Sequence, residues 1–115
     1  MSLKTYFGFA LADSMFEDGA IQRRTLSVDE VRVLVSVGVV SCCNPSHEAT
    51  IHAMRDRFSL EVAIPERPPQ VKLGDGDSII VMGVRGLPRL TDRHEYTKDE
   101  IASATFSFSL YSYSK

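Results

Sequence analysis

Apolar residues recur along the chain with two periods, one typical of helices and one of strands. A first helix is predicted to begin after Ser27, because Ser27 and Glu30 have the spacing of a capping box. Its apolar stripe follows at helical spacing: Val28, Val31, Leu34 and Val35. Gly38 suits the position just past the helix end. Val33 and Val37 fall off the stripe, so we expect a helix that is apolar nearly all round and buried.

Two further helices are predicted by caps and spacing. One covers residues 46–57, with Asn44 or Ser46 as its cap, and its apolar stripe is Ile51, Met54 and Phe58. The other is a short helix over residues 97–104, since Thr97 and Glu100 form another capping box.

Residues 78–85 give the clearest strand pattern in the chain. This run is almost continuously apolar, which indicates a strand covered on both faces. Shorter strands are predicted at 4–11, 20–26, 39–42 (a buried strand), 60–64 and 70–73.

The last predicted strand, residues 105–113, changes phase along its length. Phe106, Phe108 and Leu110 alternate with serines, whereas Tyr111 and Tyr113 take the opposite phase. A bulge, or an edge shared with another subunit, would explain the change. Aromatic residues on both faces exceed what one small subunit readily covers, so we expect a homodimer.

The order of these elements predicts the fold class. Strands interspersed with helices indicate an α/β (α+β) domain, in which a mixed sheet is flanked by about three helices. The 115 residues fit a single domain, so we assign 1–115 to one unit.

Charge and composition narrow the range of partners. A net charge of −2 argues against duplex DNA, which is bound through many Lys and Arg contacts, but it permits a small phosphate ligand. No apolar run approaches the ~20 residues of a membrane span, so no membrane partner is expected. Without a signal-peptide pattern, and with Cys42 and Cys43 adjacent and expected as buried thiols, a cytoplasmic location is predicted.

The segment around His47 is the first candidate for chemistry. His47 is predicted in the first turn of a helix, where free amides and the helix dipole attract phosphate. An imidazole there is suited to moving a proton, and Thr50 projects from the same side. The structural alternative is a half-buried histidine heading the apolar stripe, which on pattern alone is the more common case.

Arginines supply the other candidates. Arg85 ends the longest apolar strand and can present a planar fork to a phosphate, although a solvated strand-end arginine is the simpler interpretation. Arg23 and Arg24 are adjacent, a pattern that usually marks a solvated face. His47 and His52 are one residue too far apart to share a metal on a helix face, and we predict no metal and no cofactor.

Several motifs together resemble one known family. Residues 46–50, Ser-His-Glu-Ala-Thr, are similar to its Gly-His-acid-small-Thr at a helix start. Residues 69–77, the strand 78–85 with its final arginine, and residues 99–101 match further segments in order. From residue 5 to 113 the chain therefore resembles the small proteins of archaeal viruses, with bacterial relatives, whose characterised members are type III anti-CRISPR ring nucleases.

The resemblance implies a homodimer that binds cyclic tetra-adenylate in a cleft across its two-fold axis. A ribose 2′-hydroxyl attacks the neighbouring phosphate without a metal, His47 protonates the leaving 5′-oxygen, and Arg85 stabilises charge on the phosphorane. The residues carried over to ligand binding are Ser46, Glu48, Thr50, Phe9 and Ala12.

The chain departs from this family at four positions. Phe9 and Ala12 stand where the family has an asparagine and a serine, and Ser46 replaces its glycine. Pro88 stands where the family has a glutamate, for which Asp92 or Glu95 are the candidate substitutes. These changes motivate an alternative, in which a non-catalytic dimer sequesters a cyclic nucleotide or docks on a protein partner. A DNA-binding dimer ranks last on charge.

Overall fold

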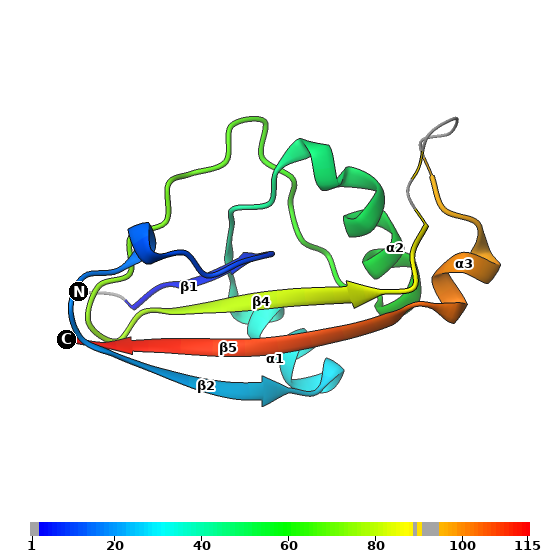
Figure 1. Ribbon diagram of the computed structural model, residues 1–115. Helices are drawn as coiled ribbons and strands as arrows, with labels where there is room; N and C mark the ends of the chain where they lie inside the picture. Colours follow the sequence, from blue (N-terminus) through cyan, green and yellow to red (C-terminus); the bar gives the residue numbers. More distant parts are fainter. Residues whose placement is uncertain (1–2, 89, 91–94) are drawn as a thin grey trace.

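A five-stranded mixed sheet in the order β2-β5-β4-β1-β3 organises the fold (Figure 1). The computed structural model describes residues 3–88, 90 and 95–115. The strands are β1 (Thr5–Gly8), β2 (Ala20–Leu26), β3 (Val40–Ser41), β4 (Ser78–Arg85) and β5 (Thr105–Ser114). β1 pairs in parallel with β3 and β4, whereas β5 runs antiparallel between β4 and β2. The mixed α+β sheet predicted from the sequence is confirmed.

Three helices accompany the sheet, as predicted: α1 (Val28–Val37), α2 (Glu48–Phe58) and α3 (Lys98–Ser103). Two short 3₁₀ turns, η1 (Asp13–Met15) and η2 (Pro45–His47), precede β2 and α2. Both capping boxes form: the Ser27 hydroxyl accepts from the Glu30 amide at 3.1 Å, and Thr97 repeats the arrangement on α3. Gly38 ends α1 with φ 128°, a conformation that favours glycine, so its predicted position is confirmed.

The prediction that α1 is buried all round was wrong. Val31 is the buried residue of the helix, while the side chains of Val33 and Val37 are 61% and 82% exposed. α1 lies behind the sheet in Figure 1 and covers one of its faces. A helix on one face of a sheet buries one stripe, so valines off that stripe face outward.

The sheet carries a separate apolar core on each face, and this explains the phase change in β5. Phe106, Phe108 and Leu110 belong to the core shared with α1 and α2. Tyr111 and Tyr113 point to the opposite face, where they pack in a second core. The register of β5 continues through both neighbouring strands, so the expected bulge or shared edge was wrong. Because one subunit covers these aromatics, β5 supplies no argument for a dimer.

Three predicted strands differ in the structure. Residues 60–64 and 70–73 form no strand, yet they bury apolar side chains: Leu60 and Val62 in the first core, Val71 and Leu73 in the second. Their alternation therefore reflects burial over the sheet, not hydrogen bonding within it. The strand predicted at 39–42 shrinks to the two residues of β3 at the sheet edge, where Val40 is 38% exposed.

Candidate functional site

His47 lies where the sequence places it, at the start of α2. β3 ends at Ser41, and the chain turns through η2 before α2 begins. The residue is exposed, and its ring centroid is 4.6 Å from that of Phe9, which follows β1. Since β1 and β3 are parallel, their carboxyl ends lie at one edge of the sheet. That shared edge brings together Phe9 and His47, which are 38 positions apart in the sequence.

Three amides at this turn, those of Ser46, His47 and Glu48, already have hydrogen-bond partners within the turn. The Asn44 carboxamide oxygen accepts from the Ser46 amide at 2.9 Å, and the Asn44 carbonyl accepts from the His47 amide at 2.9 Å. The Glu48 amide donates to the Pro45 carbonyl. Asn44, one of the two predicted caps, caps η2 instead of the predicted helix, and α2 begins only at Glu48 without a side-chain cap. The imidazole, more than these amides, is the group available to a phosphate.

The other residues predicted to bind the ligand do not form one cluster with His47. The exposed Glu48 carboxylate lies 3.7 Å from His52 Nε2, one turn along α2. Thr50 is half-buried, and Ser46 is exposed. Ala12 immediately precedes η1, away from α2 in the sequence, and its amide donates to Met15 Sδ at 3.4 Å.

Arg85 is exposed at the carboxyl end of β4, which is parallel to β1. The last residue of β4 paired with β1 is Val81, opposite Gly8, so Arg85 stands four residues or about 13 Å further along. Within residues 3–88, 90 and 95–115, Arg85 forms no ion pair and makes no recorded contact with His47. The two candidates thus lie towards one end of the sheet without touching.

An uncovered part of the sheet next to Arg85 was not predicted from the sequence. On the face opposite α1, four small residues from three strands form what we call the open sheet face: Thr25, Gly83, Ser107 and Ser109. Thr25 and Ser107 are exposed, and Gly83 and Ser109 are half-buried. The serines alternating with Phe106 and Phe108 were the signal that could have revealed it, because alternate residues of a strand share a face.

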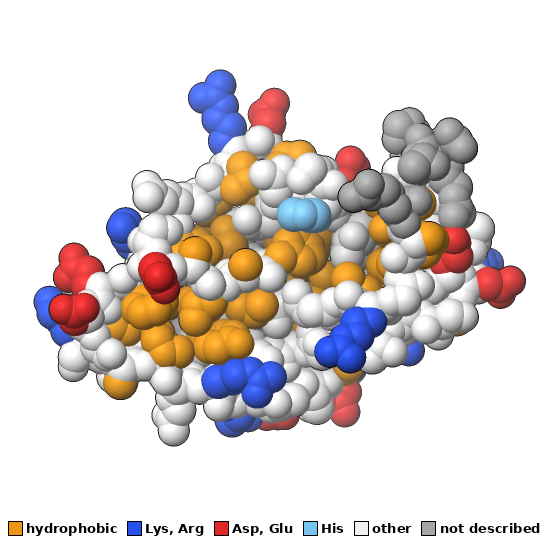
Figure 2. Space-filling view, viewed as in Figure 1, with side chains coloured by type: hydrophobic (Ala, Val, Ile, Leu, Met, Phe, Trp, Pro, Cys, Tyr) orange, Lys and Arg blue, Asp and Glu red, His pale blue; other side chains and the backbone are white. Residues whose placement is uncertain are grey.

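Figure 2 looks onto this side of the molecule. Hydrophobic side chains gather over β1 and the adjoining part of β4, and one histidine side chain lies at their border. Farther along β4 and β5 the surface carries fewer hydrophobic side chains, and Lys or Arg side chains stand along its lower border. The face therefore combines an apolar half with a polar half that has positive charge beside it.

Asp92 and Glu95 are the two candidates to replace the glutamate whose position is taken by Pro88. Asp92 lies outside the described residues. Glu95 is exposed and lines a small hollow of about 70 Å³ together with Ala49 and His52. A carboxylate is thus available beside the first turns of α2, although the hollow does not include His47.

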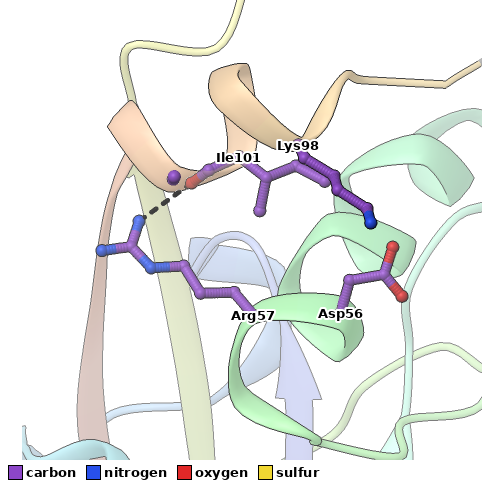
Figure 3. Close-up of a pocket in the computed structure, with 5 residues that line it drawn as sticks. Asp56, Arg57, Lys98 and Ile101 are labelled. Atoms are coloured by element: carbon purple, nitrogen blue, oxygen red, sulfur yellow. Dashed lines mark hydrogen bonds between the residues drawn. The ribbon is translucent and has the colours of Figure 1, made fainter.

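A larger hollow, about 750 Å³, lies between α2 and α3 (Figure 3). Asp56 and Lys98 extend into it from the two helices. Arg57, also on its border, donates to the carbonyls of Ile101 and Ala104 at the end of α3, so its role is to hold that helix end. Neither His47 nor Arg85 lines this hollow.

The adjacent cysteines are free thiols at the edge of the first strands. Burial raises the pKa of both thiols, and the Cys42 thiol donates to the Phe7 carbonyl at 3.2 Å. Among the described residues, no three His, Cys, Asp or Glu side chains come together as a metal site. No helix in the described part of the chain is long and apolar enough to span a membrane.

The sheet order and flanking helices define an α+β protein with a mixed five-stranded sheet. Among solved structures, this fold is similar to that of B116 of Sulfolobus turreted icosahedral virus. The TM-score is 0.68 at 15% sequence identity, with 94% of this chain and 97% of that chain covered. No family model and no curated protein sequence matches the chain. At this identity the likeness establishes the fold alone.

Proposed function

We propose that this protein is a ring-nuclease-like phosphodiesterase that binds and cleaves a cyclic oligoadenylate, cyclic tetra-adenylate being the first candidate. The observation that carries the proposal is the exposed imidazole of His47, which stands at the start of α2 beside Phe9. Motif resemblance and a fold shared with a Sulfolobus virus protein support it.

The proposed reaction is a transesterification that requires no metal. A ribose 2′-oxygen attacks the adjacent phosphorus and loses its proton, the bond from phosphorus to the 5′-oxygen breaks, and a 2′,3′-cyclic phosphate remains. His47 gives its proton to the leaving 5′-oxygen, and Arg85 offsets the charge of the phosphorane. The proton of the 2′-hydroxyl passes to solvent or to a nearby carboxylate such as Glu95.

The active unit in this proposal is a homodimer with one His47 from each subunit. A ring of four identical nucleotides presents equivalent phosphates to two symmetry-related groups, so a two-fold cleft suits it. Bringing a second subunit into the cleft also provides a way to place an imidazole and an arginine on one phosphate, since they do not touch within the described part of one chain.

The decisive experiment incubates labelled cyclic tetra-adenylate with the protein in EDTA, beside a His47→Ala variant and a matched His52→Ala control. We expect cleavage by the wild type, a loss of about 10²–10⁴-fold for His47→Ala, and little change for His52→Ala. Intact substrate with the wild type, or equal rates for wild type and His47→Ala, would refute the nuclease.

A second candidate is a non-catalytic module that sequesters the cyclic nucleotide or docks on a protein. The apolar Phe9 and Ala12, and Pro88 at the position of the family's glutamate, favour it. Titration calorimetry separates the two candidates, because binding that leaves the ligand uncut supports sequestration. Absence of binding to any oligoadenylate would leave docking on a protein.

A further inference from the structure

The open sheet face has the composition of a surface kept clear for a ligand. β5 is an interior strand, yet Ser107 and Ser109 leave its outer face with small hydroxyl groups where the other end of the strand has tyrosines. Within residues 3–88, 90 and 95–115, the hydroxyls of Thr25, Ser107 and Ser109 have no recorded hydrogen-bond partner. Three donors thus face outward on one patch.

Gly83 contributes to the same surface. Its backbone does not have the positive φ that favours glycine, so conformation does not explain the residue. A Cβ at this position would stand 2.8 Å from the Ser107 hydroxyl oxygen, closer than real contacts allow. Glycine inside a strand lowers stability and often marks a place where another molecule approaches closely. Here it keeps the Ser107 hydroxyl accessible.

Two arginines flank these hydroxyls. Arg23 of β2 pairs with Tyr111, two residues before Thr25, and so projects from the same face of the sheet. Arg85 projects from β4 two residues after Gly83, also on this face. In the described part of the chain neither guanidinium forms an ion pair, whereas Arg24, on the opposite face, is paired with Glu30. The positive charges of Arg23 and Arg85 on this face are therefore not neutralised by an ion pair within the described residues.

From this arrangement we infer that the open sheet face binds the sugar–phosphate chain of the ligand, with Ser107 and Ser109 donating hydrogen bonds to phosphate oxygens. Small hydroxyls between guanidinium groups suit phosphate, because both kinds of group donate hydrogen bonds to anionic oxygens. Among the described residues, the polar half has no exposed aromatic ring on which a base could stack. The inference rests on the proposed function and adds to it the surface that holds the ligand.

The test measures the dissociation constant of cyclic tetra-adenylate by calorimetry for a Ser107→Ala/Ser109→Ala double variant. A hydrogen bond to a charged group is worth enough that we expect binding to weaken at least about tenfold. Ser114→Ala is the matched control, since this exposed serine of β5 points to the other face. Gly83→Ala should also weaken binding, because its methyl group crowds Ser107.

The outcomes are separable. If the wild type binds and the double variant binds within twofold, the open sheet face is not the ligand surface, although the proposed function survives. If the wild type binds no cyclic tetra-adenylate, the proposed function fails and this inference fails with it. Amide shifts of Ser107 and Ser109 in a nuclear magnetic resonance titration of the wild type give a second measurement that needs no variant.

Discussion

At the scale of single residues, the contact between Phe9 and His47 is the main difference between the candidate site and the ring nucleases that the sequence resembles. An aromatic ring lies 4.6 Å from the imidazole at a position where the family carries an asparagine. Phe9 is half-buried and packs against the first core, so it serves both packing and the site surface. A polar side chain here would exchange some packing for a contact to the ligand.

We therefore expect Phe9→Asn to tighten binding of cyclic tetra-adenylate by about tenfold, the effect of one added hydrogen bond to a charged group. The same change should lower the free energy of unfolding by about 1–3 kcal/mol, because it removes a ring from the core boundary. Calorimetry and denaturant unfolding measure the two effects. Phe9→Leu is the control: it should cost less stability and leave binding unchanged, and tighter binding by Phe9→Leu would contradict this role.

At the scale of elements, the capping box and the apolar stripe of α1 contribute to stability in two different ways. The Ser27 amide, bonded to the Glu30 carboxylate at 3.0 Å, and then Arg24 hold the pKa of this carboxyl below its ordinary value of 4.5. Folding therefore favours the ionised form of the Glu30 carboxyl group. The resulting stability is complete above the unfolded pKa and is lost as pH falls through the folded pKa.

The measurable consequence is a smaller acid sensitivity in Glu30→Gln, which keeps an oxygen acceptor but cannot titrate. Between neutral pH and pH 3, the wild type should lose more unfolding free energy than the variant. Urea unfolding at several pH values tests this. Parallel pH profiles for the two proteins would show that the carboxylate contributes nothing to the acid dependence.

Two valines on α1 offer a matched comparison of burial. Val31→Ala removes a fully buried side chain and should lower the free energy of unfolding by about 1–3 kcal/mol. Val37→Ala, at a side chain 82% exposed, should change it by no more than about 0.5 kcal/mol. Thermal unfolding of both variants checks the difference. A large cost at Val37 would indicate that another molecule covers this surface.

At the scale of the whole molecule, the question is which edges and faces remain for a second subunit. β2 is an edge strand, but Arg23 and Arg24 place positive charge on it, which discourages pairing with a copy of itself. Among the described residues, the exposed large apolar side chains are instead the outer valines of α1, Val40 of the edge strand β3, and Leu3. A dimer formed by pairing the β2 edges is therefore not expected.

We expect light scattering at micromolar concentration to give the mass of a dimer, about twice the 12.8 kDa chain. Arg23→Ser should leave that mass unchanged, since charged β2 is not the expected contact. A monomer over this concentration range would count against any cleft that spans two subunits. Dimers seen only with Arg23→Ser would show that β2 was blocked by its charge.

The sequence alone determined the features that depend on neighbouring residues. Both capping boxes, the end of α1 at Gly38, the bounds of β4 and the place of His47 at a helix start follow from local spacing. These features are local because a cap or a stripe involves residues within a few positions. Candidate site residues, though not their contacts, could therefore be named from the sequence.

Only the tertiary structure decided which distant segments meet. It placed β5 inside the sheet, divided the apolar residues between two cores, and turned residues 60–64 and 70–73 into covers instead of strands. It also paired the amides before α2 and left Thr25, Gly83 and the two serines of β5 on one open face. Sheet order depends on pairing across long separations, such as Tyr6 with Ile79, which no local pattern encodes.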